Sequence, residues 1–565
     1  MDKVWQIFKQ DAPLAANLAH ELKISSLTAQ VLINRGIHDL REAQAFLKPS
    51  LADLRNPMEI PNIEKAAKRV LLAKERGEKV CVYGDYDVDG VTGTAILVNT
   101  LKLLGLDTIY YIPHRYGEGY SLSDASVAEI AKMGVKLIVT VDCGISNFKE
   151  IEEAKRLGLE VVVTDHHNLP EKLPNAYAIV NPKQIKGDHP SKYLAGAGVA
   201  FKFAWALLRV AGVKDSVFLT ALLDLAALGT ISDVVPLTAE NRILAVMGLK
   251  YINERKRPGI KALAEVASLY KNIAVNQIYF GLAPRINAAG RLEHASKSVD
   301  LLLTEDANEA QALAEELDEI NVRRRGIGEE IRDDVFSNIN DQYVAENKVV
   351  VISGENWHPG VIGIVASRVV DAYFRPAVLI SVNEGVGRGS ARSLAGINVY
   401  ELLNACKDLF IDFGGHEGAA GFEIKPENIP ELKKRLKTES DRLIRLEDMK
   451  PKVVVDSVLD PAQITMSLVR ELDILDPHGE GNPKPIFMSS GLKLADVRTV
   501  GKKGAHLKVK FAVGETSLEA IGFRMGDLSD KLSYNTNYDI AYRLEANEWD
   551  GFEVAQLNLV DIRES

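Results

Sequence analysis

The sequence predicts an α/β protein with a parallel sheet, followed by a second, smaller α/β module and a C-terminal β-barrel. Three observations support this fold class. From about 78 to 182, short β-rich runs alternate with helical segments, as in βαβ units of a parallel sheet. A second α/β pattern occupies about 348 to 446. From about 452 to 565, strand-like runs alternate with turn signals, which favours a small barrel.

Length and composition limit the possible classes. The 565 residues exceed one hydrophobic core and indicate roughly two to four domains. The apolar runs are shorter than the ~18 residues of a membrane-spanning helix, and the N-terminus lacks a signal-peptide pattern. Cys81, Cys143 and Cys406 form no CxxC pair, which argues for a reducing cytoplasm and against structural zinc. The net charge of -10 does not exclude nucleic acid, because bound cations would cancel part of it.

The elements follow in chain order. Residues 1–55 are expected to form short helices, and the strands of the parallel sheet are expected in KVCVYGD, TIYYIPHR, KLIVTVDCG, EVVVTDHH and AYAIVNP. Residues from about 195 to 303 are expected to be mainly helical. The segment 304–346 is rich in Glu, Asp and Arg with a helical apolar period, which predicts a long bridging helix with a solvated face.

Polar residues follow three strands of the predicted sheet directly, in GDYDVDG, VDCG and TDHH. The carboxyl ends of strands in an open parallel sheet share one edge, and ligands bind just outside it. We therefore expect the three clusters to meet in space. Asp85, Asp87 and Asp89 lie so close that their carboxylates repel one another unless cations offset the charge.

Divalent cations favour carboxylate oxygens together with one or two imidazoles. Four segments offer such ligands: Asp87 with Asp89, Asp142, the run Asp165-His166-His167, and Asp233. Five or six ligands from four segments suit a pair of metal ions. A single Asp after a strand is usually a helix cap or turn residue. Three strand ends of one sheet that all carry ligand-type residues favour the metal interpretation. Asp85 is either a further ligand or a partner of the ligands, and Asp224 is expected to be structural.

Several of these motifs resemble a known family. GDYDVDG, VDCG, TDHH and GTISD resemble the four ordered motifs of the DHH phosphoesterase superfamily. APRINAAGRL, ENWHPGVIGIVASR, GRGSARS and GGHEGAAGF resemble the RecJ family of single-stranded-DNA-specific exonucleases, the last being the mark of its DHHA1 domain. The resemblance covers the whole chain. It implies an N-terminal helical region (1–55), a DHH catalytic domain (56–303), a connecting helix (304–346), a DHHA1 substrate-binding domain (347–448) and an OB-fold nucleic-acid-binding domain (449–565).

The resemblance also implies residue roles. The metal ligands that it implies are Asp87, Asp89, Asp142, His166 and Asp233, with Asp142 as the bridge between two Mn²⁺ or Mg²⁺ ions. The implied catalytic set adds His167, which matches the residue beside the scissile phosphate. The implied substrate contacts are Arg285, Asn287, Arg291, Ser390, Arg392 and His416. Tyr83 stands where related pyrophosphatases have a metal-binding His. The second ion is then left with fewer protein ligands unless Asp85 compensates.

The implied activity is metal-dependent, stepwise hydrolysis of single-stranded DNA from the 5′ end to 5′-mononucleotides, in DNA repair and recombination. Metal ions activate water and offset the charge of the phosphate. The forked guanidinium groups of Arg388 and Arg392 would hold phosphate oxygens, and Gly387 and Gly389 would let the backbone approach the phosphate closely. A barrel suits a polymer, because OB-folds combine basic grooves with aromatic platforms. The groove candidates are Lys502, Lys503, His506, Lys508 and Lys510, and the aromatics expected mainly in the barrel core are Phe511, Phe523, Tyr542 and Trp549.

Two other interpretations stay open. A DHH-type phosphodiesterase for short oligonucleotides or cyclic dinucleotides would commonly lack the C-terminal barrel. A non-catalytic replication scaffold should have lost metal ligands, yet all five are present. The resemblance further implies a cytoplasmic monomer that acts on DNA with a free 5′ end, has no membrane partner, and works with a helicase and a single-stranded-DNA-binding protein.

Overall fold

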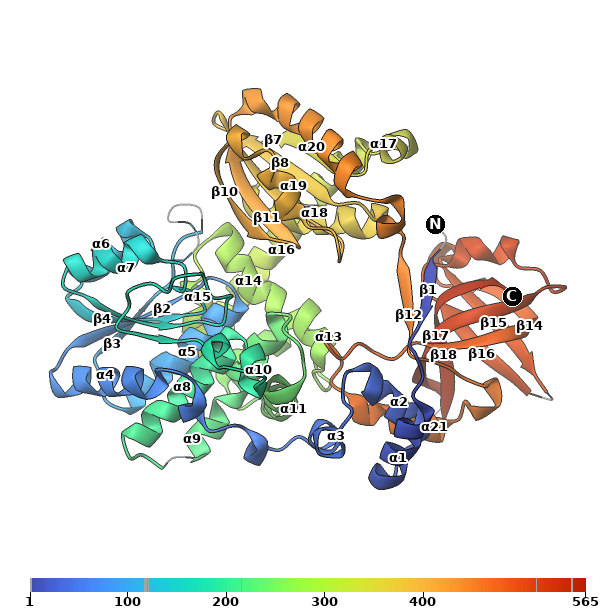
Figure 1. The fold of residues 1–565 in the computed structure, drawn as a ribbon, viewed down its shortest axis with the longest axis horizontal. Coiled ribbons are helices and arrows are strands. Elements are labelled where there is room, and N and C mark those ends of the chain that lie inside the picture. Colours follow the sequence, from blue (N-terminus) through green and yellow to red (C-terminus); the bar gives the residue numbers. More distant parts are fainter. Residues whose placement is uncertain (1–2, 116–118, 120, 215, 515, 550–551) are drawn as a thin grey trace. The chain divides into compact units, whose positions relative to one another are not determined.

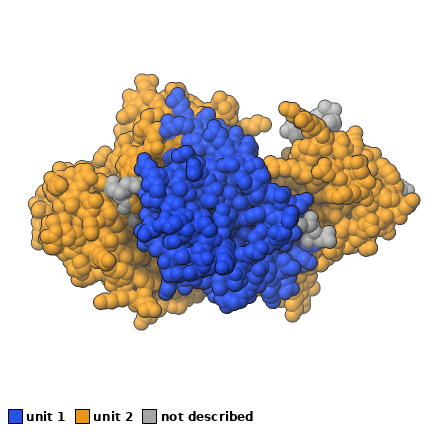
Figure 2. Space-filling model, turned by 90° about the horizontal axis from the view of Figure 1, so that it is seen from above, with its two compact units in different colours: residues 1–4, 319–452 blue, residues 5–318, 453–565 orange. Residues whose placement is uncertain are grey.

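The computed structural model describes residues 3–115, 119, 121–214, 216–514, 516–549 and 552–565 (Figure 1). The chain forms two compact units (Figure 2). Unit 1 comprises residues 1–4 and 319–452, and unit 2 comprises residues 5–318 and 453–565. Among the described residues, no helix is both long and apolar enough to span a bilayer.

Unit 2 contains the predicted parallel sheet, with strand order β3-β2-β4-β5-β6. The strands are β2 (Lys79–Gly84), β3 (Thr108–Tyr111), β4 (Val135–Val141), β5 (Glu160–Thr164) and β6 (Ala178–Val180), and all pair in parallel. The intervening helices are α4 (Ile63–Glu75), α5 (Val88–Leu103), α6 (Asp124–Lys132) and α7 (Phe148–Arg156). The apolar runs of β2, β4 and β5 are almost fully buried because helices cover both faces of such a sheet. The sequence prediction of this sheet is confirmed.

A set of helices continues unit 2, as expected for 195–303. They are α8 (Gly196–Val210), α9 (Ser216–Ala221), α10 (Leu223–Ser232), α11 (Ala239–Glu254), α12 (Pro258–Val266), α13 (Val275–Gln277), a π-helical segment (Ile278–Leu282), α14 (Ala283–Leu292) and α15 (Ser296–Leu303). α5 packs against both α8 and α10. The predicted long helix is present as α16 (Ala307–Ser337), and the short α17 (Asp341–Glu346) begins after a cap at Asn340.

Unit 1 is the smaller α/β module. Its mixed sheet has the order β10-β11-β9-β8-β7. The strands are β7 (Val350–Glu355), β8 (Ala377–Asn383), β9 (Val386–Arg392), β10 (Phe410–His416) and β11 (Ala419–Ile424), and the helices are α18 (Pro359–Tyr373), α19 (Val399–Asn404) and α20 (Ile429–Leu443). Only β7 and β8 pair in parallel; the other pairs are antiparallel.

The C-terminal part of unit 2 is the predicted barrel. Its strands are β13 (Ser457–Val458), β14 (Phe487–Val500), β15 (His506–Val513), β16 (Thr516–Gly522), β17 (Asn537–Trp549) and β18 (Phe552–Glu564), and pairing of β14 with β17 closes the sheet. β1 (Val4–Ile7) and β12 (Lys452–Val455) form a separate two-stranded sheet.

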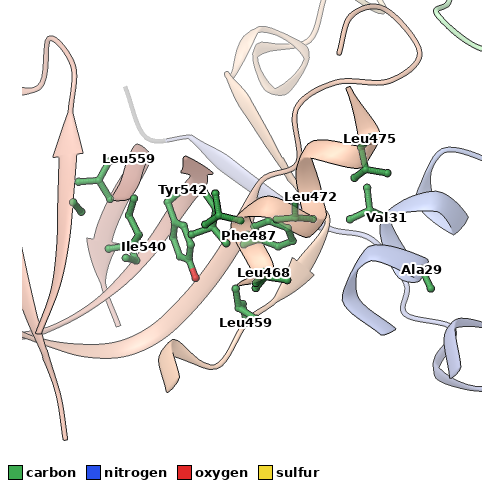
Figure 3. Close-up of a cluster of buried hydrophobic side chains, with 14 of the residues drawn as sticks. Ala29, Val31, Leu459, Leu468, Leu472, Leu475, Phe487, Ile540, Tyr542 and Leu559 are labelled. Atoms are coloured by element: carbon green, nitrogen blue, oxygen red, sulfur yellow. The ribbon is translucent and has the colours of Figure 1, made fainter. Parts of the chain in front are cut away.

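The N-terminal helices share one hydrophobic core with this barrel. They are α1 (Ala12–Leu22), α2 (Ser26–Asn34) and α3 (Leu40–Leu47). Figure 3 shows Val31 of α2 beside Leu472 and Leu475, with Phe487 and Tyr542 of the barrel in the same cluster. A buried ion pair between Arg35 and Asp456 (2.7 Å) strengthens the contact. Residues 1–55 therefore pack on a part of the chain more than four hundred residues away, which local sequence patterns do not reveal.

Candidate metal centre

The three crowded aspartates lie where β2 gives way to α5. Asp87 caps α5: its Oδ1 accepts hydrogen bonds from the backbone N–H groups of Asp89 (2.9 Å) and Gly90 (3.1 Å). Asp89 lies in the first helical turn and is buried, and its two oxygens accept from the N–H groups of Gly196 (2.6 Å) and Ala197 (2.8 Å). These donors belong to the N-terminus of α8, whose dipole favours a carboxylate.

The other two strand ends meet the first at the same edge. Asp142 follows β4 with a φ of 61°, and its N–H donates to Thr164 O (3.1 Å) at the end of β5. Asp165 Oδ1 accepts from the N–H of His166 (2.7 Å) and from Nδ1 of His167 (2.7 Å). Asp165 thus orients both histidines of the TDHH motif, a role that the sequence analysis did not assign to it.

Three of the predicted carboxylate ligands converge around one imidazole, that of the predicted ligand His166. His166 Nε2 lies 3.1 Å from Asp142 Oδ1, 3.6 Å from Asp233 Oδ2 and 3.8 Å from Asp89 Oδ2. His167 Nδ1 lies 3.9 Å from Asp142 Oδ1. The expected meeting of strand ends is therefore confirmed, together with Asp233 at the end of α10.

The donor set fits divalent cations. Two groups of three ligand atoms, each within 4.8 Å of one another, divide the cluster: Asp89, His166 and Asp233 form one, and Asp85, Asp87 and Asp142 form the other. A third such group joins Asp142 to both histidines. His166 Nε2, Asp233 Oδ2 and Asp85 Oδ1 are buried without a hydrogen-bond partner among the described residues, as expected of atoms that face an ion. The structure thus places Asp85 beside two of the predicted ligands, Asp87 and Asp142.

The electrostatics of the cluster point the same way. Burial, with repulsion from neighbouring carboxylates, raises the pKa of Asp89 to about 7 and that of Asp233 to about 9. The same causes raise the pKa of Asp85 and Asp142 well above the ordinary range. Burial lowers the pKa of His166 to about 3, so its imidazole is neutral and able to bind a metal.

His167 differs from His166. Burial alone would lower its pKa, but the hydrogen bond to Asp165 and the surrounding carboxylates raise it above the ordinary value. The ring is half exposed, with 46% of the side chain accessible, so a charged imidazolium can meet an anion from solvent.

A cavity of about 380 Å³ opens over the cluster. It is lined by Asp85, Tyr86, Asp87, Arg115, Ser232, Asp233, Asn287 and Arg291. Of the predicted substrate residues on α14, Arg291 and Asn287 therefore reach the site. Asn287 Oδ1 also accepts from Val88 N–H (3.2 Å) and so holds the start of α5. Arg285 instead binds Asp318 (2.9 Å) and the carbonyls of Gly281 (2.7 Å) and Val266 (3.3 Å).

Besides the role of Asp165, sequence reasoning missed two features of this site. Arg115 adds positive charge to the cavity and stacks over Tyr86, with its guanidinium 4.8 Å from the ring centroid. Gly196 and Gly229 make room for the carboxylates, because a Cβ atom there would lie 2.8 Å and 2.9 Å from the oxygens of Asp89. The signal was the AGAG run that opens α8, which also fits ordinary helix packing.

Tyr83 lies away from the cluster. Its hydroxyl donates to Ser121 O (2.8 Å), and its ring stacks on Tyr111 at 5.5 Å. Tyr83, which stands where the related pyrophosphatases have a histidine, is thus a residue of the core.

The predicted substrate residues of unit 1 lie on its sheet. Ser390 and Arg392 follow each other on one face of β9, and Arg392 Nη1 donates to Ser390 Oγ (3.2 Å). His416 is exposed at the end of β10. The interpretation of the neighbouring glycines was wrong: a Cβ at Gly389 would lie 2.1 Å from the Phe422 ring, and Gly387 similarly makes room for Ile424. These glycines admit core side chains, and Arg388 pairs with Glu423 (2.9 Å).

In the barrel, Phe511 and Tyr542 are core residues, as expected. Phe523 is instead 53% exposed and packs edge-on against His506 at 5.3 Å. Lys502 and Lys503 are exposed in the turn that precedes His506, whereas Lys508 and Lys510 both pair with Glu519. The side chain of Trp549 lies outside the described residues.

Comparisons with known proteins agree with this architecture. Family models match residues 79–230 (DHH family, N-terminal domain), 346–439 (DHHA1 domain) and 455–561 (RecJ OB domain). The single-stranded-DNA-specific exonuclease RecJ of Bacillus subtilis is 38% identical over 560 residues, covering 99% of this chain and 70% of the relative. That of Escherichia coli is 34% identical over 576 residues, covering 99% of both.

Solved structures give the same result. Crystal structures of RecJ from Thermus thermophilus match with a TM-score of 0.86 at 34% identity in complex with Mn²⁺ and of 0.81 at 33% identity in complex with Mg²⁺. They cover 100% of this chain and 80% and 78% of the solved chains. This protein belongs to the RecJ family of single-stranded-DNA-specific exonucleases.

Proposed function

We propose that this protein is a metal-dependent exonuclease that degrades single-stranded DNA from its 5′ end to 5′-mononucleotides, with two Mn²⁺ or Mg²⁺ ions as cofactors. The observation that carries the proposal is the buried His166 Nε2, which faces three carboxylate oxygens within 3.8 Å and has no hydrogen-bond partner among the described residues. Such an arrangement is unfavourable unless cations bind between these groups.

The ligand roles follow from the two groups of donors. Asp89, His166 and Asp233 would hold one ion, and Asp87, with Asp85, would hold the second, with Asp142 shared between them. Cations bound there lower the pKa of a water molecule and offset the charge of the phosphodiester. The two histidines of the DHH motif thus lie at one strand end, and Asp165 of the same motif holds them in place through hydrogen bonds from their backbone N–H groups.

Other side chains would bind and orient the substrate. Arg291 and Arg115 add positive charge over the carboxylates, so that a phosphate can enter the cavity. His167, whose pKa is raised, would donate a hydrogen bond or a proton to a phosphate oxygen beside Asp142. Asn287 acts mainly by fixing the start of α5. The Arg285 guanidinium binds Asp318. We propose that Arg285 acts on the substrate indirectly, by fixing the position of α14.

Polymer binding would involve exposed aromatic rings. Phe523 and His506 form a platform next to Lys502 and Lys503 on the barrel. Phe280 is 81% exposed in the π-helical segment that precedes α14, and we propose that a base of the strand stacks on it outside the cavity. Ser390, Arg392 and His416 of unit 1 are proposed to bind phosphate, since they gather polar groups on β9 and at the end of β10.

We also propose the domain division 1–55, 56–303, 304–346, 347–448 and 449–565, in which 1–55 packs on the barrel instead of standing alone. The substrate is a strand with a free 5′ end, supplied by a helicase and kept unpaired by a single-stranded-DNA-binding protein. A cytoplasmic monomer agrees with three buried cysteines that form no disulfide.

The test uses 5′- and 3′-labelled single-stranded DNA, duplex DNA and RNA, with Mn²⁺, Mg²⁺ or EDTA. Immediate release of the 5′ label as a mononucleotide, in Mn²⁺ or Mg²⁺ and not in EDTA, is the expected result. Equal digestion of duplex would refute strand specificity. A preference for dinucleotides over long strands would favour the short-oligonucleotide phosphodiesterase instead.

A further inference from the structure

The turn that follows Asp233 has an unfavourable backbone conformation. Residues 234–238, here called the Asp233 turn, connect α10 to α11. Val234 has a φ of 60°, and Ala239, just after the turn, has a φ of 48°. The left-handed region is unfavourable for a residue with a side chain, and a β-branched residue is especially disfavoured there. Such a conformation persists only where surrounding contacts impose it.

The contacts come from the barrel side of unit 2. Residues 476–482, here called the barrel-side loop, precede β14 and pack on the Asp233 turn. The N–H of the buried Leu237 donates to Glu480 O (2.8 Å). A Cβ at Gly479 would lie 2.6 Å from Leu237 Cδ1, and one at Gly481 would lie 3.0 Å from Pro236 Cβ. The two glycines thus permit the close approach of two backbone segments.

Buried polar side chains fix the barrel-side loop in place. Arg242 of α11 is 1% exposed and donates to the carbonyls of Asp476 (2.8 Å), Pro477 (3.4 Å) and Phe46 (2.6 Å). Its guanidinium also lies 3.7 Å from the centroid of the Phe46 ring. Asn482 closes the loop from within, because its amide donates to Leu475 O (2.8 Å) and Pro477 O (3.0 Å). One arginine therefore joins α11, the N-terminal helices and the barrel.

Asp233 depends on its backbone for its position more than Asp89 does. Asp89 has two backbone N–H donors on its carboxylate, whereas Asp233 Oδ2 is buried with no hydrogen-bond partner among the described residues. On its N-terminal side, Asp233 N–H donates to Gly229 O (2.9 Å) and anchors it to α10. On its C-terminal side, the anchor is the Asp233 turn. Ligands must be held within a fraction of an ångström for a metal site to form.

We infer that the barrel-side loop is a positioning element of the metal centre: through Leu237 and the Asp233 turn it sets the place of the Asp233 carboxylate, 3.6 Å from His166. The inference rests on the proposed function in treating Asp233 as a metal ligand. It gives the C-terminal part of the chain a role in the catalytic site besides DNA binding.

The test first enlarges the residue on one side of the contact, Gly479, and then shortens the residue on the other side, Leu237. Gly479→Ala places a methyl group against Leu237 Cδ1 at a residue whose φ is not in the left-handed region. Leu237→Val removes the Cδ atoms, and the double variant combines both. Glu480→Gln is the control, because it changes the exposed side chain and leaves the carbonyl acceptor in place. Mn²⁺ binding to the full-length protein is measured without DNA from the electron paramagnetic resonance of free Mn²⁺, together with thermal unfolding.

Gly479→Ala is expected to weaken Mn²⁺ binding about ten-fold, and the double variant to recover to within about two-fold of Leu237→Val. Glu480→Gln should bind as wild type. Unchanged Mn²⁺ affinity in Gly479→Ala, or no recovery in the double variant, overturns the inference. If Gly479→Ala does not fold, Arg242→Lys, which keeps the charge and loses the forked donors, must show the same weakening. Because DNA is absent, a wild type that binds Mn²⁺ without cutting DNA would refute the proposed function alone.

Discussion

Asp233→Asn should stabilise the metal-free protein while it removes a metal ligand. In wild type, the raised pKa of Asp233, about 9 against an ordinary 3.8, means that the folded state retains a proton that the unfolded chain releases. Such a carboxyl contributes its full stabilisation of the folded state at pH values below the pKa that it has in the unfolded chain. This stabilisation is lost as the pH rises towards the pKa that it has in the folded state. Asparagine carries no titrating proton and avoids the loss.

The magnitude follows from the pKa difference. At about pH 8 the carboxyl lies roughly four pH units above its ordinary value of 3.8, which at about 1.4 kcal/mol per unit sets a ceiling near 6 kcal/mol. The neighbouring aspartates share the same repulsion, and 21% of the Asp233 side chain is exposed to water. We therefore expect a stabilisation of about a third of the ceiling, roughly 2 kcal/mol, which corresponds to a few degrees in Tm. At about pH 5, only about one unit above the ordinary pKa, the gain should shrink to well under about 1 kcal/mol.

The assay is thermal unfolding of wild type and Asp233→Asn in EDTA and in Mn²⁺, at both pH values. Asp188→Asn, at an exposed position, is the matched control and should change little. In EDTA at about pH 8 the variant should melt higher; in Mn²⁺ the order should reverse, because only wild type gains the binding energy of the ion. A variant that melts lower than wild type in EDTA would show that the carboxylate makes a stabilising contact and would refute the reasoning.

Three further predictions concern substrate and metal. Phe523→Ala should raise the KM for long single-stranded DNA about ten-fold and leave hydrolysis of a dinucleotide unchanged, since one stacked base contributes roughly 1–3 kcal/mol; an equal loss on both substrates would place Phe523 elsewhere in the mechanism. Arg291→Met should lower kcat/KM about a hundred-fold with little change in Tm, whereas Arg285→Met should lower Tm through the lost Asp318 pair; the opposite ranking would reassign the two arginines. Titration of the metal-free protein with Mn²⁺ in two buffers of different ionisation enthalpy should show proton release at about pH 7, because Asp89 and Asp233 must ionise to bind; no release would contradict their raised pKa values.

The sheet and the meeting of the Asp and His side chains at its edge were predictable because each has a local signal. Continuous apolar runs mark strands buried on both faces, and the residues after three of them carry the ligand chemistry. Asp85 could not be assigned from sequence, since its place among the ligands depends on where Asp142 lies in space.

Features set by distant contacts were not predictable. Nothing in LAANLAHELKI indicates that α1 and α2 join the core of a barrel near the other end of the chain. The glycines of GRGSARS have the same local appearance whether they admit a phosphate or a phenylalanine ring, and only the pairing of β9 with β11 shows that Phe422 lies against Gly389.

Asp142→Asn tests the central claim most directly, because Asp142 is the one carboxylate that belongs to two of the three ligand groups and is proposed to serve both ions. The measurement is the single-turnover release of the 5′ nucleotide from labelled single-stranded DNA in Mn²⁺, alongside DNA affinity in EDTA. We predict that the variant releases the nucleotide at least about a thousand-fold more slowly and binds DNA as well as wild type or better, since a negative charge has been removed. Hydrolysis within a few fold of wild type would contradict a metal centre built around Asp142.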